Sequence, residues 1–162
     1  MDFISEFPKV DDKASIMVVV DRFLKYSVII VAPELCSYQI AVDLFYKYVV
    51  KYFGVLADIV SDGDTRFTSR FWTIFFNMME IELKFSTANH PQTDGQTERI
   101  NHLLEEYLRH YVTASQRNWV TLLDTAQFFY NMHNSSATEM SPFEIVLGRQ
   151  PMTPLDVPKS KN

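Results

Sequence analysis

Three acidic residues stand where the chain changes from one predicted element to the next. Asp2 opens the first predicted strand, Asp62 follows the fourth, and Glu98 lies in the first turn of a long predicted helix. In α/β folds, strand ends and helix starts meet at the sheet edge where ligands bind. Three unpaired carboxylates repel one another, and a bound hard cation such as Mg²⁺ or Mn²⁺ relieves that repulsion. An oxygen-lined site of this kind is typical of phosphoryl transfer.

The residue types alone leave ordinary structural roles open. Asp62 lies in an Asp-Gly-Asp sequence, which is common turn chemistry. Glu98 can simply stabilise the positive end of a helix. Cys36 is the one cysteine, so no disulfide forms within the chain, and it is best interpreted as a small buried or half-buried side chain.

The hydrophobic pattern predicts how these acids are positioned. Residues 2–7, 15–20 and 26–31 have strand composition and short connections, which favours an antiparallel meander. Two further short strands, at 57–61 and 83–87, each follow a predicted helix and would join as crossover strands. The prediction is therefore an α/β fold with a five-stranded mixed sheet flanked by helices.

Five segments have helical periodicity or helix-start signals. In the first, Ser37 is the expected N-cap and Gly54 the expected stop, and the apolar spacing predicts one buried face. That face comprises Ala41, Leu44, Phe45, Tyr48, Val49, Tyr52 and Phe53. The other helices are expected at 69–80, 100–112, 119–132 and 141–147, the last starting with a Ser-Pro pair. Residues 1–148 are predicted to form one core domain, followed by a Pro-containing tail at 149–162.

Composition restricts the classes of function. Apolar residues make up 47% of the 162, so the chain is globular, and its longest apolar run, residues 28–32, is too short to span a membrane. Fifteen basic and 20 acidic residues give a net charge of −5. Affinity for duplex DNA depends on the number of phosphates neutralised, so weak DNA binding is expected unless basic charge is concentrated locally.

Several long motifs resemble one family closely. The strings SDGDTRFTSRFW, STANHPQTDGQTERIN and MSPFEIVLGRQP, with the opening MDFI and VVVDRFLKY, are similar to the integrase core of gypsy-type LTR retrotransposons. The resemblance extends from residue 1 to about residue 154. It implies a ribonuclease-H-like fold, DNA integration through 3′-end processing and strand transfer, and a nuclear place of action. It also implies DNA as partner and a homo-oligomer in the full-length integrase.

The same resemblance implies the roles of individual residues. Asp2, Asp62 and Glu98 match the catalytic triad, with 35 residues between the last two. Asp2 and Asp62 would hold one Mg²⁺ or Mn²⁺ ion, and Asp2 and Glu98 a second. In the resembled family the loop before the catalytic helix meets the DNA end, which implies DNA contact for His90, Gln92, Thr93, Asp94 and Gln96. Arg99 and Asn101, on the helix that follows, are further candidates for DNA contact. The alternative for Arg99 is a solvated surface position.

The start of the chain suggests a fragment. Met1 directly precedes Asp2, so the first strand would lack its upstream half, and the family's flanking zinc-binding and DNA-binding domains are not in the sequence. Because chain ends fray unless held, Asp2 is expected to be poorly fixed, with weak metal binding and poor joining of DNA ends. The alternatives are a catalytically defective nucleic-acid-binding or assembly module of the same fold and, less favoured, a nuclease acting on RNA–DNA hybrids.

Overall fold

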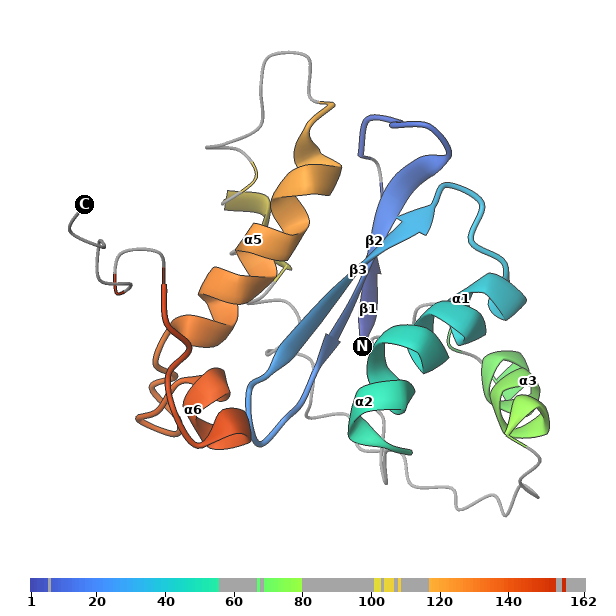
Figure 1. Cartoon of the computed structure of the whole chain (residues 1–162). Helices are drawn as coiled ribbons and strands as arrows, with labels where there is room; N and C mark the ends of the chain where they lie inside the picture. Colours follow the sequence, from blue (N-terminus) through green and yellow to red (C-terminus); the bar gives the residue numbers. More distant parts are fainter. Residues whose placement is uncertain are drawn as a thin grey trace, which may run out of the picture.

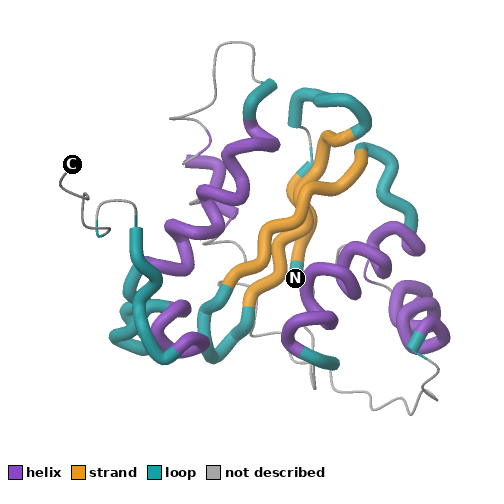
Figure 2. Tube along the Cα trace, viewed as in Figure 1, coloured by secondary structure: helices purple, strands orange, loops and turns teal. Residues whose placement is uncertain are grey.

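The computed structural model describes residues 1–5, 7–55, 67, 69–79, 101–102, 104–106, 108, 117–153 and 156. Within these ranges the fold is mixed α/β, with a three-stranded antiparallel sheet and several helices. Figure 1 shows the sheet between two groups of helices, and Figure 2 shows the same layering by secondary structure. The predicted strands at 57–61 and 83–87 lie outside the described residues, so the five-stranded sheet stays a prediction.

The described strands form the predicted meander. Their order is β1 (Asp2–Ile4), β2 (Lys13–Val20) and β3 (Ser27–Pro33), each antiparallel to the next. β2 is buried from Ala14 to Val19, as expected for a strand with both faces covered.

The first strand is shorter than predicted. It ends at Ile4 instead of extending to residue 7, although the Phe7 N–H still donates to the Ala14 carbonyl of β2 at 3.2 Å. The Phe7 side chain packs on Trp119. The two rings stack with their centroids 4.8 Å apart, and the Trp119 indole N–H donates to the Pro8 carbonyl at 2.8 Å. Pro8 has no N–H for a strand ladder.

One face of the sheet is covered by a helical segment over residues 38–53 and by α3 (Ser69–Met78). The segment consists of α1 (Tyr38–Phe45), a π-helical turn η1 (Tyr46–Val50) and α2 (Lys51–Phe53). Ser37 caps its start by accepting from the Ile40 N–H at 3.3 Å, and Gly54 ends it with φ +79°. Both end signals are therefore confirmed.

The predicted buried face of this segment is wrong for three of the four residues after Phe45. Tyr48, Tyr52 and Phe53 are 40%, 68% and 44% exposed. Val49 is buried as predicted, and Val50, which was not part of the predicted face, is buried as well. A π-helical turn contains more residues than an α-helical turn, so it rotates every later side chain relative to Phe45. The 3.6-residue spacing used for the prediction does not hold through η1.

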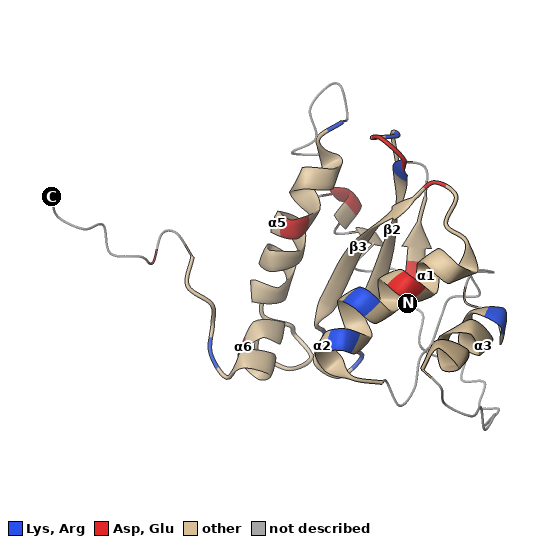
Figure 3. Ribbon diagram, turned by 45° about the vertical axis from the view of Figure 1, so that its right-hand side comes forward, with Lys and Arg blue, Asp and Glu red and all other residues tan. Residues whose placement is uncertain are grey.

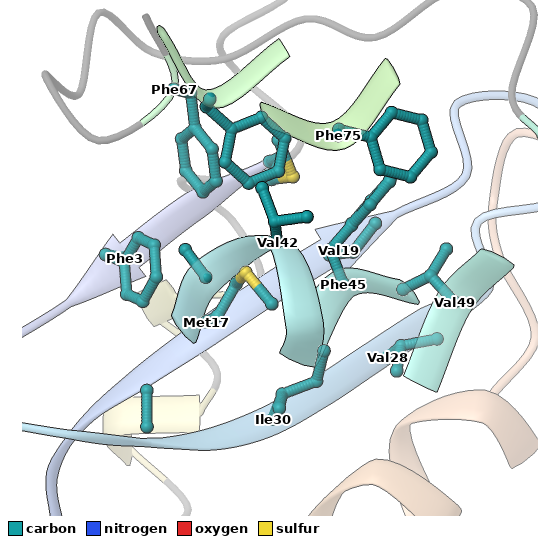
Figure 4. Packing of buried hydrophobic residues seen from close by; sticks show 14 of the residues in the cluster. Phe3, Met17, Val19, Val28, Ile30, Val42, Phe45, Val49, Phe67 and Phe75 are labelled. Atoms are coloured by element: carbon teal, nitrogen blue, oxygen red, sulfur yellow. The ribbon is translucent and has the colours of Figure 1, made fainter. Parts of the chain in front are cut away.

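Aromatic side chains fill the core beneath this layer. Phe3 stacks on Phe67 with ring centroids 5.2 Å apart, and Phe45 meets Phe71 and Phe75 edge to face at 5.9 and 5.6 Å. Figure 4 shows Phe45, Phe75 and Val42 packed over β2 and β3. Edge-to-face geometry is favourable for such rings.

The opposite face packs against α5 (Trp119–Met132), a helix with the predicted bounds, and against the helical residues Leu104 and Leu108. These leucines lie against a cluster containing Ile16, Val18 and Ile29. α6 (Pro142–Leu147) starts at the predicted Ser-Pro pair and has a full capping box between Ser141 and Glu144.

Two side-chain amides of α5 form hydrogen bonds with backbone groups on the outer edge of β3. Asn131 accepts from the Ser27 N–H at 2.8 Å and donates to the Ser27 carbonyl at 2.9 Å. Gln127, one turn earlier, accepts from the Ile29 N–H at 2.6 Å. These bonds occupy backbone groups that would otherwise be available to a further strand.

In the tail, the described residues 149–153 and 156 contain no helix or strand. No helix in the described ranges is both long and apolar enough to cross a bilayer.

Candidate active site around Asp2

Asp2 is the first residue of β1, and the residues on either side of it are buried. The backbone of Asp2 pairs with Val18, and the next residue, Phe3, is buried against Phe67. Met1 is only 6% exposed. The expectation that Asp2 frays with the chain end is therefore wrong for this segment, because apolar side chains on either side of Asp2 are buried.

Both carboxylate oxygens of Asp2 accept hydrogen bonds. Oδ1 accepts from the Phe3 backbone N–H at 2.7 Å, and Oδ2 accepts from the Asn101 side-chain amide at 2.6 Å. The second bond joins residues 99 positions apart in sequence. It fixes the orientation of the half-buried carboxyl group at the start of the strand.

The helix carrying Asn101 is docked by its apolar side. Asn101, Leu104 and Leu108 follow one another at three- and four-residue intervals, which places them on one helix face. The two leucines are buried against the β2–β3 face. Asn101 continues this face at the end nearest Asp2, so the packing of the leucines sets the position of the amide.

The donor atoms of this pair suit a hard cation. Asp2 supplies carboxylate oxygens, and the Asn101 Oδ1 atom is buried and accepts no hydrogen bond within the part of the chain that the structure describes. Mg²⁺ and Mn²⁺ prefer such oxygen donors. No group of three potential metal-binding side chains occurs among the described residues, however, and Asp62 and Glu98 lie outside them.

Most of the predicted DNA-contacting residues lie outside the described residues, namely His90, Gln92, Thr93, Asp94, Gln96 and Arg99. Asn101, a predicted DNA-contacting residue, is the one member of that set that the structure describes, and its amide donates to Asp2. The contact between Asn101 and Asp2 was not foreseen. The signal for it was the spacing that puts a polar amide at the end of the Leu104–Leu108 face.

Comparison with known proteins points to a mobile element. The chain is 37% identical over 159 residues to the Transposon Tf2-3, Tf2-4 and Tf2-5 polyproteins of Schizosaccharomyces pombe. The match covers 98% of this chain and 12% of each polyprotein. No protein-family model matches the chain. The similarity to the polyproteins supports a retrotransposon-derived protein.

Proposed function

We propose that this retrotransposon-derived chain is an integrase catalytic core, which processes the 3′ ends of element DNA and joins them to a target. The observation that carries the proposal is the 2.6 Å hydrogen bond between Asn101 and Asp2. Asn101 is the last residue of HPQTDGQTERIN, the most specific of the integrase-like strings. The bond therefore brings the end of that string to the first proposed catalytic acid.

Glu98 precedes Asn101 by three residues. If the helix extends back by one turn, Glu98 lies on the same side as Asn101, beside Asp2. Asp62, at the end of its predicted strand, would complete the set. Asp2 and Asp62 would then hold one Mg²⁺ or Mn²⁺ ion, and Asp2 and Glu98 the other. Such ions stabilise the attacking and leaving oxygens of a phosphoryl transfer.

Asn101 has a positioning role in this proposal. Its amide N–H holds one oxygen of Asp2 and leaves the remaining lone pairs of the carboxylate free to bind a cation. Partners that orient a metal ligand in this way typically contribute about 10–100-fold in metal affinity or activity. We further propose DNA as the substrate, assembly with further copies, and action in the nucleus.

The test is an Mn²⁺-dependent strand-transfer and disintegration assay on the 162-residue chain. Asp2→Asn and Glu98→Gln should abolish the product, and Asn101→Ala should lower activity about 10–100-fold while raising the Mn²⁺ concentration required. His102→Ala is the matched control, because His102 is the exposed neighbour of Asn101. Urea denaturation of each variant separates loss of activity from loss of folding.

Two results would contradict the proposal. One is product formation that persists in Glu98→Gln. The other is a folded chain that binds element-end DNA but yields no product at any Mn²⁺ concentration, which would favour the non-catalytic binding module.

A further inference from the structure

We propose that the outer side of the helical segment 38–53 binds single-stranded nucleic acid. The binding surface consists of Lys47, Tyr48, Lys51 and Tyr52, called here the Lys–Tyr strip. The proposal needs no divalent cation and does not depend on the proposed active site. It adds a second nucleic-acid contact to a chain whose net charge is −5.

The π-helical turn creates the strip. Phe45, Val49 and Val50 occupy the core side of the segment, and the extra residue in the turn directs Tyr48 and Tyr52 to solvent. The two tyrosines are 40% and 68% exposed. π-helical turns are frequent at functional sites. Here the turn exposes two aromatic rings that a regular helix with this spacing would bury.

The two lysines lie beside these rings and have no ion-pair partner among the described residues. Lys47 Nζ is 5.1 Å from the centre of the Tyr48 ring, and Lys51 Nζ is 5.5 Å from the centre of the Tyr52 ring. Asp43, one turn before Lys47, already accepts a hydrogen bond from Gln39 at 3.1 Å. Figure 3 shows the basic positions of this segment on the side away from the sheet.

The local charge favours an anionic partner. Between residues 35 and 55 the chain has two lysines and one acid, Asp43, so this segment is net positive in an acidic protein. A second copy docked on the same strip by a two-fold axis would bring four lysines together against two aspartates. A phosphate backbone avoids that repulsion and gains from both lysines.

The exposed rings favour unpaired nucleotides over duplex. Bases stack on aromatic side chains when they are free of a partner strand, and each stacked base contributes about 1–3 kcal/mol, or on the order of 5- to 150-fold in affinity. The strip offers two rings and two cations, which is a small site. We therefore expect a dissociation constant of about 10⁻⁴–10⁻⁶ M at moderate salt, the usual range for nonspecific binding.

The experiment uses the full 162-residue chain in EDTA, which excludes any metal-dependent site. Fluorescence anisotropy measures binding of a labelled 20-nucleotide oligo(dT) and of a duplex of equal length, from low to moderate salt. The logarithm of the association constant falls linearly with the logarithm of the salt concentration, and each phosphate neutralised adds about 0.7 to the steepness of that slope for a single strand. Lys47→Gln/Lys51→Gln removes two such contacts and should therefore make the slope shallower by about 1.4. Tyr48→Leu/Tyr52→Leu should weaken oligo(dT) binding about tenfold or more, and the double Tyr→Phe variant should retain it.

A matched control removes two positive charges elsewhere. Arg117→Gln/Arg149→Gln changes net charge equally at exposed positions outside the strip and should leave oligo(dT) binding nearly unchanged. Equal losses in both charge variants would overturn the proposal. So would absence of oligo(dT) binding by the native chain, or a preference for duplex. Self-association in sedimentation that is lost in Tyr48→Leu/Tyr52→Leu, without oligo(dT) binding, would assign the strip to a contact between copies instead.

Discussion

Asn131 connects α5 to the edge of β3, and replacing it measures what that connection contributes. Its side chain and Ser27 are both fully buried, and the two residues exchange two hydrogen bonds. Asn131→Leu keeps the volume but leaves the Ser27 N–H and carbonyl without partners. Each unsatisfied buried group costs about 1–3 kcal/mol, and burial of the leucine offsets about 2 kcal/mol. The two unsatisfied groups together cost about 2–6 kcal/mol, so the expected loss in the free energy of unfolding is about 0–4 kcal/mol.

Asn131→Asp gives the sharper result because its effect depends on pH. A protonated carboxyl group can accept from the Ser27 N–H and donate to the Ser27 carbonyl, whereas a carboxylate can only accept. Ionisation in this buried position is unfavourable, so we expect the folded-state pKa of the new aspartate to lie above its unfolded value of about 3.9. The variant should thus be close to the native protein in stability near pH 4. It should lose stability progressively as pH rises through the folded-state pKa.

Urea denaturation from pH 4 to 7 gives the free energy of unfolding of the variant and of the native protein at each pH. The difference between the two values removes the effect of groups that titrate in both proteins. Asn134→Asp is the matched control, because Asn134 is exposed and follows the same helix. The difference in free energy of unfolding between Asn134→Asp and the native protein should vary little with pH. If Asn131→Asp matches the native protein at pH 7, the two hydrogen bonds to Ser27 do not stabilise the fold in the way argued.

Three further variants test single contacts in the described core. Trp119→Phe keeps the ring stacking on Phe7 but removes the bond to the Pro8 carbonyl, so a loss of about 1–3 kcal/mol in urea denaturation is expected. Ser141→Ala removes the oxygen that accepts from the Glu144 N–H and should lower the free energy of unfolding by about 1–2 kcal/mol in urea denaturation. An unchanged urea midpoint would show that this cap does not stabilise the fold. Burial raises the pKa of the Tyr26 phenol, so the unfolded chain ionises first and native stability falls as pH rises above about 10. Tyr26→Phe should reduce that alkaline loss, measured from unfolding midpoints at about pH 9 and pH 11 relative to native protein.

Sequence was most informative where short-range chemistry decides the structure. The cap at Ser37, the stop at Gly54 and the Ser141–Pro142 helix start were all predicted, because each depends on a few neighbouring residues. After Phe45 the predicted buried face holds for Val49 but not for Tyr48, Tyr52 and Phe53. The prediction assumed a regular helix, and the π-helical turn changes which later side chains face the core.

The candidate site shows the same division between local and long-range information. Spacing alone indicates that Asn101 lies one helical turn beyond Glu98. Whether its amide faces DNA or Asp2 depends on which sheet face the helix covers, and that is decided by the burial of Leu104 and Leu108 against Ile16 and Val18. Likewise, the fraying expected at Asp2 assumed a free end, whereas the burial of Met1 and Phe3 holds the strand in place. Both features depend on contacts between distant segments, so a reading of local pattern could name the residues of the site but could not orient them.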